Sequence, residues 1–583
     1  MSVDLNKPDI CNIASALVSQ TERQADNIAI HYPLGKRRGQ VQYRSVSYSE
    51  LNGLSDDYAR GLIEYGIGRG IRTALMLTPG LDFFAMFFAL FKVGAVPVLI
   101  DPGIGIKPLK TCLAEAGPEA FIGVTRAQIA RKILGWVPDA KLVTSGPMLG
   151  WGGLSTKQLR KLGQKTSGPV LADTLPDELA ALLFTSGSTG IPKGVVYRHR
   201  HFIAQVEMLQ SAFDIRPGEV DLPTFPPFAL FDPAMGMTTV VPLMDPTRPA
   251  RADPKLLVQT INRFDVTNIF GSPALLNVLG RYTESEKIQL PSVRRVISAG
   301  AAMPVTTIRR LQKTLPAGAE VHTPYGATEC LPVASVSGTE LDEDVERRTA
   351  AGEGTCVGHP VSPNRVRIIP VTDSVIETFE DCVDLPIGIT GEIVVNGPTS
   401  TDSYWQWEKM TDSAAGGRPK DQPEPPEEDR ETERGQEQTR LAKIYDADGK
   451  TWHRMGDAGY LDTDGRLWYC GRKSQRVITT QGTLFADQIE AIFNTHPEVA
   501  RTALVGIGIA GRQIPVLCVE TLNKPGRQRR ERIRFDLLQI GRSHTATNMI
   551  TKILFHKSFP VDIRHNAKIG REELARWAAK RLA

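Results

Sequence analysis

The clearest chemistry in this sequence lies in a run of glycines and hydroxyl residues, TSGSTGIPKG, at residues 185–194. An apolar run at 179–184 precedes it and another starts at Val195, which predicts two strands joined by a loop. Small residues let backbone N–H groups approach a polyphosphate closely, and Lys193 adds a positive charge. The loop is not a Walker A motif, because Pro192 stands where that motif has its second glycine. We therefore expect this loop to bind a nucleoside triphosphate.

The sequence around this loop alternates between helical and extended patterns. Residues 47–66 and 81–94 have the periodicity of helices, whereas 73–79 and 95–101 are typical of strands. The alternation returns between residues 254 and 304, where an extended run ends in a glycine-containing turn. Such βαβ alternation predicts an α/β fold with a parallel sheet that helices cover on both faces.

The loop resembles the signature of the adenylate-forming superfamily, which includes acyl-CoA synthetases, peptide-synthetase adenylation domains and luciferases. Three later segments resemble further motifs of this superfamily and occur in its order: TPYGATE (323–329), MGDAGYLDTDGRLWYCGRK (455–473) and FPVDIRHNAKIGR (559–571). The resemblance covers almost the whole chain. It implies an N-terminal domain of layered α/β subdomains with a small β-barrel-like part, followed by a small mobile α+β C-terminal domain.

The resemblance also implies ATP and Mg²⁺ and assigns residues to them. Glu329 would hold the Mg²⁺, which prefers oxygen ligands, together with Thr185. Lys568 would stabilise the charge that develops during adenylation. With Glu329 and Lys193, it makes up the implied catalytic set. The nucleotide would contact Thr185, Ser186, Gly187, Ser188, Thr189, Gly190, Lys193, Gly300, Ala301, Tyr325, Gly326, Thr328, Asp457 and Arg472.

Within that set, the resemblance gives individual roles to four side chains. Tyr325 would stack on the base and Thr328 would bind the phosphate. Asp457 would accept both ribose hydroxyls, and Arg472 would lie beside the nucleotide. Each of these residues alone is more typical of an ordinary surface charge or core position, so the prediction depends on their joint order with the phosphate loop.

Residues 222–250 occupy the position where members of the superfamily line the acyl pocket. Many members carry PLFH there, but this chain has Pro226, Pro227, Phe228 and Ala229, so no histidine contact to the carboxylate is implied. The Phe, Met and Leu content favours an apolar tunnel for an alkyl chain. The predicted pocket residues are Phe228, Phe231, Gly271 and Ser272.

Several longer phrases, including residues 101–124, 195–202 and FALFDPAMGM, resemble the β-lactone synthetases of olefin and β-lactone pathways. That branch implies ATP-dependent activation of a 2-alkyl-3-hydroxy fatty acid, whose own hydroxyl then closes the ring without coenzyme A. His199 and His201 are candidates for proton transfer, because histidine is the natural general base near pH 7. A surface cluster at the N-terminus of a helix is the alternative for either histidine.

The motifs predict a domain boundary, and the composition predicts an insertion. The superfamily's hinge comes just after a Gly-Arg pair, here Gly471 and Arg472, which places it at Ser474, so the expected domains are 1–473 and 474–583. Residues 408–440 contain ten acidic residues, six basic residues and four prolines, and almost no large apolar side chains. We expect this charged insertion to remain disordered, because it cannot bury enough apolar surface to fold.

Composition excludes several other classes. The 583 residues are 41% hydrophobic and 23% charged, and 69 Lys and Arg against 65 Asp and Glu leave a net charge of +4, too small for a nucleic-acid footprint. The most apolar run is too short to span a membrane, and no signal peptide is expected. Seven scattered cysteines favour a reducing, cytoplasmic location.

Three functions remain open from the sequence. The β-lactone synthetase would take a hydroxylated fatty acid, with other enzymes of the same lipid pathway as partners. A long-chain fatty acyl-CoA synthetase or fatty acyl-AMP ligase would take a plain fatty acid. A non-catalytic acyl-nucleotide binding protein is disfavoured, because a degenerate site would be expected to have lost some of its charged residues.

Overall fold

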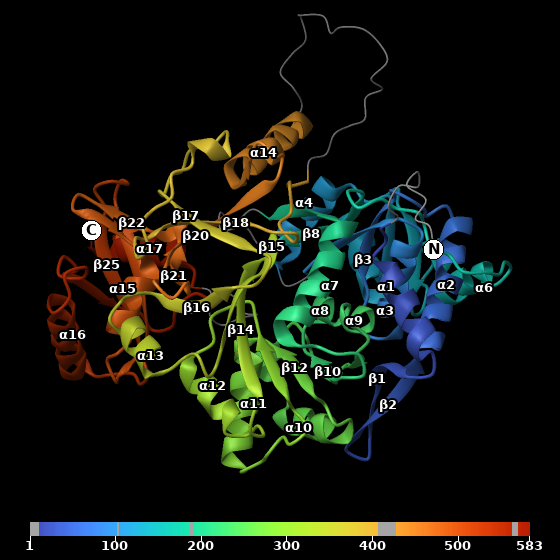
Figure 1. The fold of residues 1–583 in the computed structure, drawn as a ribbon, viewed down its shortest axis with the longest axis horizontal. Coiled ribbons are helices and arrows are strands. Elements are labelled where there is room, and N and C mark those ends of the chain that lie inside the picture. The colour runs from blue at the N-terminus through green and yellow to red at the C-terminus, as the bar shows by residue number, and fades with distance from the viewer. Residues whose placement is uncertain (1–10, 102–103, 186–191, 406–426, 562–568, 583) are drawn as a thin grey trace, which may run out of the picture.

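The computed structural model describes residues 11–101, 104–185, 192–405, 427–561 and 569–582. Its described strands pair into two large sheets and, in the C-terminal part, a three-stranded and a two-stranded sheet. Figure 1 shows the N-terminal elements at the right and the C-terminal elements at the left, with β14 (Glu320–Ala327), β15 (Cys330–Ser337) and β16 (Thr355–Pro360) between them. None of the described helices is long and apolar enough to cross a membrane.

The first sheet carries the two strands that flank the predicted phosphate loop. Its strand order is β7 (Leu154–Ser155), β6 (Lys141–Ser145), β5 (Ala120–Val124), β3 (Arg72–Met76), β4 (Val96–Ile100), β8 (Leu179–Thr185) and β9 (Lys193–Arg198). All neighbours are parallel except β8 and β9, which pair as an antiparallel hairpin. The expected strands around the loop are therefore confirmed.

Helices cover both faces of this sheet. One face packs against α1 (Ala14–Gln24), α2 (Tyr48–Glu64), α3 (Leu81–Lys92) and α7 (His199–Phe213). The opposite face packs against α4 (Ile106–Ala116) and α5 (Thr125–Leu134), and α6 (Thr156–Gly163) lies along α2. Local signals start these helices where expected: Ser47 and Glu50 form a capping box at α2.

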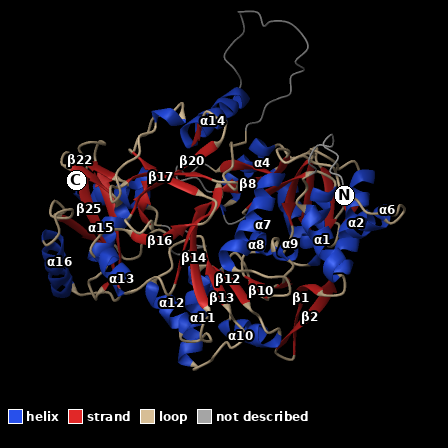
Figure 2. Ribbon diagram, in the orientation of Figure 1, coloured by secondary structure: helices blue, strands red, loops and turns tan. Residues whose placement is uncertain are grey.

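The second sheet is longer and combines strands from residue 28 to residue 472 of the chain. Its order is β17 (Arg365–Ile369), β18 (Gly391–Asn396), β20 (Thr451–Leu461), β21 (Leu467–Arg472), β16, β15, β14, β13 (Arg295–Ser298), β12 (Asn268–Gly271), β10 (Val220–Pro223), β11 (Thr238–Val240), β1 (Ile28–Arg37) and β2 (Gln40–Ser47). A fourteenth strand, β19 (Lys443–Tyr445), pairs with β20. Figure 2 shows α10 (Pro254–Arg263), α11 (Pro273–Ser285) and α12 (Val305–Gln312) beside β12 and β13.

The expected mixed α/β class is confirmed, but the expected barrel-like part is wrong. Within the described chain, β17 and β2 end the long sheet, and no strand pairing joins them into a closed barrel. The antiparallel pairs continue the parallel strands β13 and β14 through β15 and β16. From β16 the sheet continues to β21, and it stays open because its end strands, β17 and β2, do not pair with each other.

The charged insertion also differs in part from expectation. Residues 408–426 lie outside the described residues, whereas α14 (Glu427–Ala442) is helical. Glutamate, arginine and glutamine are good helix formers, so this stretch can be helical without a large apolar face. Its last turn is anchored to the body of the protein: Thr439 accepts a hydrogen bond from the backbone of Tyr404, and Arg440 pairs with Glu377 at 2.6 Å.

The remaining short elements connect these layers or form the C-terminal part. Among the segments that connect strands of the long sheet are α8 (Pro226–Ala229), α9 (Asp232–Met235), η2 (Pro249–Arg251), α13 (Glu343–Ala350) and η3 (Phe379–Asp381). After η4 (Lys473–Gln475) come β22 (Val477–Thr479), β23 (Gly482–Leu484), α15 (Ala486–Phe493), β24 (Val499–Ile507), β25 (Ile514–Thr521), α16 (Arg527–Arg542), β26 (Lys552–Phe555) and α17 (Arg571–Leu582). The expected α+β content of this part is confirmed.

Candidate active site

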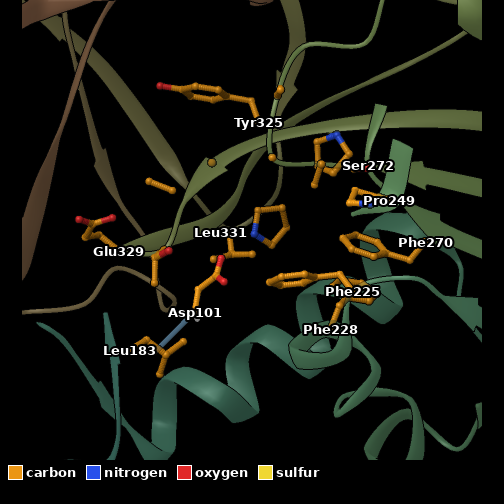
Figure 3. A pocket seen from close by; sticks show the side chains of 18 of the residues that line it. Asp101, Leu183, Phe225, Phe228, Pro249, Phe270, Ser272, Tyr325, Glu329 and Leu331 are labelled. Carbon is orange, nitrogen blue, oxygen red and sulfur yellow. The ribbon is translucent and has the colours of Figure 1, made fainter. Parts of the chain in front are cut away.

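A cavity of about 2760 Å³ lies where the two large sheets meet the C-terminal part. Its lining includes ends of the first sheet, β14 and β20 of the second, and residues of α15 and α17. Figure 3 shows Glu329 at one side of this pocket and Phe225, Phe228 and Phe270 at the other, with Leu331 between them. A polar region and an aromatic region thus share one cavity.

The polar region contains a buried carboxylate held by two neighbours. The pairing of β20 with β21 places Asp457 directly opposite Arg472, whose Nη1 lies 2.9 Å from Asp457 Oδ1. Tyr325, from β14, donates a hydrogen bond of 2.6 Å to Asp457 Oδ2. Burial raises the pKa of Asp457, and the positive charge of Arg472 and the hydrogen bond from Tyr325 oppose that shift. Arg472 and Tyr325, from two different motifs, therefore converge on one carboxyl group.

Asp457 retains capacity to bind a ligand. Arg472 is close to Oδ1 but is not aligned as a hydrogen-bond donor, and no other described residue donates to that oxygen. A buried acceptor of this kind is costly unless a donor reaches it. The two hydroxyls of a ribose are such donors, so the arrangement fits a nucleotide.

Glu329 is held at the cavity by a second tyrosine. Tyr404 Oη donates a 2.7 Å hydrogen bond to Glu329 Oε1. The backbone carbonyl of Glu329 accepts hydrogen bonds from the amide and hydroxyl of Thr401, at 2.8 and 3.1 Å. The segment at 401–404 therefore holds both the backbone and the side chain of this glutamate.

These contacts test whether the site fits Mg²⁺. The described residues include no cluster of three His, Cys, Asp or Glu side chains that would hold a metal by themselves. Mg²⁺ is usually bound by one or two carboxylates together with substrate phosphates and water. A single positioned carboxylate beside a nucleotide site, as at Glu329, matches that pattern.

Two lysines lie on the ring of Tyr404. Lys193 Nζ is 4.8 Å from the ring centroid, and Lys443 Nζ is 5.7 Å from it. Lys443 is buried and donates to the carbonyl and hydroxyl of Thr401. Burial lowers the pKa of Lys443 to about 8, although Glu329 acts in the opposite direction. Positive charge is thus concentrated where phosphates would meet Glu329.

Other predicted nucleotide residues line the same cavity. Gly300, Ala301, Gly326 and Thr328 are all among its walls. Gly300 follows β13 with φ of +93°, a left-handed conformation that favours glycine. The structure therefore gathers residues from four separate sequence segments around one space.

Several predicted residues cannot be placed. Ser186, Gly187, Ser188, Thr189, Gly190 and Lys568 lie outside the described residues, as does the side chain of Thr185. Ile569 and Gly570, which follow Lys568 directly, line the cavity. The roles assigned to this group stay predictions.

The apolar region is a continuous row of aromatic rings. Ring centroids are separated by 5.6 Å between Phe91 and Phe202, 6.1 Å between Phe202 and Phe231, and 6.2 Å between Phe231 and Phe228. Phe228 then stacks on Phe270 at 3.6 Å with nearly parallel planes. The row joins α3 and α7 to α8 and β12, and it provides a wall suited to alkyl chains.

Three of the four predicted pocket residues line the cavity: Phe228, Phe231 and Ser272. The Ser272 hydroxyl also caps α11 by accepting from the backbone of Leu275 at 3.4 Å. Gly271 is not among the lining residues. A side chain added there would meet Leu275 and Leu276, so this glycine allows close packing of α11.

The two histidines proposed for proton transfer are in the core rather than at the cavity. His199 Nδ1 accepts a hydrogen bond from the backbone of Ile13, and burial lowers its pKa to about 4. His201 Nδ1 accepts from the backbone of Arg198, and burial with nearby positive charge lowers its pKa to about 3. Both imidazoles are therefore neutral at pH 7 and far less basic than proton transfer at that pH requires. The structure argues against the catalytic interpretation of this pair.

Comparison with known proteins agrees with this geometry. The family described as AMP-binding enzyme matches residues 17–405. The chain belongs to this AMP-binding enzyme family. It is 50% identical to the olefin beta-lactone synthetases of Xanthomonas campestris pv. campestris and of Stenotrophomonas maltophilia, with 98% and 99% of each chain covered respectively. The solved amide bond synthetase McbA from Marinactinospora thermotolerans has the same fold, with a TM-score of 0.73 at 19% identity over 97% of this chain and 99% of that one.

As an AMP-binding enzyme, the chain has site residues that its motifs did not reveal. Tyr404 bonds to Glu329 and Lys443 lies by the Tyr404 ring, although they stand 75 and 114 positions after Glu329 in the sequence. Tyr197, in β9, and Gln205, in α7, also line the cavity. A polar residue among the apolar positions of α7 is the only sequence signal that could have indicated Gln205.

Proposed function

We propose that this AMP-binding enzyme activates a 2-alkyl-3-hydroxy fatty acid with ATP and closes it to a β-lactone, releasing AMP and pyrophosphate. The observation that carries the proposal is the shared cavity, in which Asp457 and Glu329 lie at one end and the aromatic row at the other. Two relatives of 50% identity over nearly their full length carry the name olefin beta-lactone synthetase.

ATP would lie with its ribose at Asp457 and its phosphates near Lys193 and Thr328. Glu329 would hold Mg²⁺, which supplies positive charge to the phosphate oxygens. Tyr404 keeps the carboxylate of Glu329 in place, and Lys443 adds positive charge behind it. The chain's own contribution here is to hold fixed charges where the phosphates sit.

In the first half-reaction, a carboxylate oxygen of the acid attacks the α-phosphorus, and pyrophosphate leaves. Negative charge builds up at the phosphate during this step, so a lysine there stabilises the transition state. We assign that role to Lys568, which immediately precedes the cavity-lining Ile569. The product is the mixed anhydride of the acid with AMP.

In the second half-reaction, the substrate's 3-hydroxyl oxygen attacks its own C1 carbon, and the bond from C1 to the AMP oxygen breaks. The hydroxyl proton passes to the phosphate of the departing AMP. Holding hydroxyl and carbonyl together converts this step into an efficient intramolecular reaction. The aromatic row keeps water away from the anhydride, which would otherwise hydrolyse.

We also propose that residues 474–583 form a mobile lid. Ser474 lies between two ion pairs to the N-terminal part, Lys473 with Glu392 at 2.9 Å and Arg476 with Asp373 at 2.5 Å. Rotation about Ser474 would keep the first pair and break the second. Replacing Ser474 with proline should therefore preserve pyrophosphate release in a single turnover and slow steady-state turnover; equal effects on both would contradict a hinge here.

Product analysis tests the function directly. Purified protein would be incubated with ATP and Mg²⁺, with and without coenzyme A, and with matched 2-alkyl-3-hydroxy and plain fatty acids. We expect lactone from the hydroxy acid in the absence of coenzyme A. Thioester formed from plain acid only when coenzyme A is present would instead identify an acyl-CoA synthetase.

A further inference from the structure

Gln205 is a polar residue on an otherwise apolar face of α7. The other residues of this helix that line the cavity are Phe202, Leu209 and Phe213, at the spacing of one helix face. Gln205 is only 3% exposed, so its amide lies inside the protein rather than in solvent. A buried glutamine among phenylalanines needs partners for both ends of its amide.

The Nε2 end of the Gln205 amide is linked through Tyr197 to Thr328, one of the residues expected to bind the nucleotide. Tyr197 Oη donates a 2.5 Å hydrogen bond to the backbone carbonyl of Thr328, in the segment that carries Glu329. Gln205 Nε2 lies 3.1 Å from the same Tyr197 oxygen. The tyrosine therefore links Gln205 to the part of the cavity where the phosphates would lie.

This link determines which way the amide points. A carbonyl oxygen can only accept, so the single hydroxyl proton of Tyr197 is used on Thr328. The Tyr197 oxygen must then accept from the Gln205 NH₂ group, which leaves Gln205 Oε1 at the other end. No hydrogen bond to Oε1 is found among the described residues, and this oxygen is not one of the fully enclosed atoms that lack a partner, so it is open to the cavity that Gln205 lines. A hydrogen-bond donor bound in the cavity can therefore reach it.

We propose that Gln205 Oε1 accepts a hydrogen bond from the 3-hydroxyl of the acyl substrate; this inference rests on the proposed function. The 3-hydroxyl is carried two carbons beyond the carboxyl carbon, so its partner must lie between the phosphate-binding residues and the alkyl wall. Gln205 has this position, since Tyr197 joins it to Thr328 and Phe202 lies on the same helix face.

The interaction has a consequence for ring closure. The hydroxyl donates its hydrogen bond to Gln205 Oε1, so a lone pair of the hydroxyl oxygen remains available to face C1. Gln205 does not remove the proton, because an amide oxygen is too weak a base. Its role is to select hydroxylated acids and to orient the nucleophile.

Gln205→Met tests this role, because methionine has a similar length without hydrogen-bonding groups. The measurement is kcat/KM for pyrophosphate release with a 2-alkyl-3-hydroxy acid and with its 3-deoxy analogue of identical chains. We expect the wild type to prefer the hydroxy acid. In Gln205→Met, kcat/KM for the hydroxy acid should fall about tenfold, equivalent to about 1.4 kcal/mol, and kcat/KM for the deoxy acid should fall less than about threefold.

Equal losses for both acids, or an unchanged preference, would overturn the inference and leave Gln205 with a packing role. Tyr197→Phe provides a second variant: it keeps the ring, releases the amide, and should reduce the same selectivity ratio. Gln210→Met is the matched control, since Gln210 is on the same helix but donates to the backbone of Met235. Its ratio should equal that of the wild type.

The outcome is separable from that of the proposed function. The selectivity ratio is measured in the adenylation half-reaction, which does not require lactone formation. A wild type that makes no lactone while preferring hydroxy acids through Gln205 would refute ring closure alone. A wild type that makes lactone while Gln205→Met keeps its preference would refute the inference alone.

Discussion

Tyr404 and Glu329 are 75 positions apart in the sequence, and their side chains meet in a 2.7 Å hydrogen bond at the edge of the cavity. The phenol donates and the carboxylate accepts, so one oxygen of Glu329 is occupied by the protein. The other is left for a cation. The tyrosine ring is in turn flanked by Lys193 and Lys443. Orientation of the proposed metal ligand therefore depends on a residue outside every recognised motif.

Replacing Tyr404 with phenylalanine should weaken the response to Mg²⁺. The ring and its contacts with the two lysines remain, but the hydrogen bond that orients Glu329 is lost. Loss of a partner of a metal ligand typically costs about 10- to 100-fold in metal affinity or activity. We expect the Mg²⁺ concentration for half-maximal pyrophosphate release to rise at least about tenfold. Tyr445→Phe, which removes an exposed hydrogen bond to the Asp402 backbone, is the control and should need the same Mg²⁺ concentration as the wild type.

Replacing Asp457 with asparagine should weaken ATP binding specifically. The amide has nearly the shape of the carboxylate, but it has one acceptor oxygen fewer and leaves Arg472 without its charge partner. We expect the KM for ATP to rise about tenfold or more, with a small change in the KM for the acid. The exposed Asp464, in the turn between β20 and β21, supplies the control Asp464→Asn. An unchanged KM for ATP in Asp457→Asn would count against the ribose assignment.

His199→Gln should leave turnover nearly unchanged, since the glutamine side chain keeps an acceptor for the Ile13 amide. Removal of a general base would instead cost about 10²- to 10⁴-fold in kcat. The lowered pKa of His199, about 4, also predicts the pH dependence of stability. Its contribution is present above the unfolded pKa of about 6.5 and is lost as pH falls towards 4.

The unfolding temperature of His199→Gln should accordingly fall less than that of the wild type between pH 7 and pH 5. Differential scanning calorimetry at the two pH values provides the comparison. A large loss of kcat in His199→Gln with intact folding would restore the catalytic interpretation.

Asp221 and Asp232 form a buried carboxyl pair beside the acyl region. Thr239 donates to Asp232 at 2.9 Å and Asn268 donates to Asp221, while the remaining oxygens, Asp221 Oδ2 and Asp232 Oδ1, are buried with no hydrogen-bond partner among the described residues. We infer that the two acids share a proton, because two neighbouring carboxyl groups buried in this way do not both ionise. Burial raises the pKa of Asp221 to about 7 and that of Asp232 well above its usual value. The pair anchors α9 to β10 and β11.

A raised pKa in the fold stabilises the protein below the unfolded pKa of about 3.9, and this stability is lost as pH rises through about 7. Asp232→Asn supplies a permanent donor in place of the shared proton. We expect its unfolding free energy to fall less than that of the wild type between pH 5 and pH 8. Asp214→Asn, at an exposed residue paired with Arg216, should follow the wild type. A steeper loss in Asp232→Asn would refute the shared proton.

Local sequence was sufficient for the elements and the family. The βαβ alternation placed α2, β3, α3 and β4 where the structure has them, because apolar periodicity reflects which face of each element is buried. The phosphate-loop hairpin followed from two apolar runs and a glycine-rich connection. The order of the motifs indicated a nucleotide site, since each motif carries its chemistry in adjacent residues.

Tertiary structure decided which side chains the nucleotide and acyl regions contain. The histidines next to the loop had the right chemistry for proton transfer, yet packing buries both and lowers their pKa values. Tyr404 and Gln205 reach the cavity, and Lys443 reaches Thr401 and the ring of Tyr404, through pairings of distant strands and helices, which no local pattern encodes. Motifs determine the reaction class through residue type and spacing; burial and long-range contacts determine the basicity, orientation and selectivity of each group, because these depend on neighbours that only the folded chain brings together.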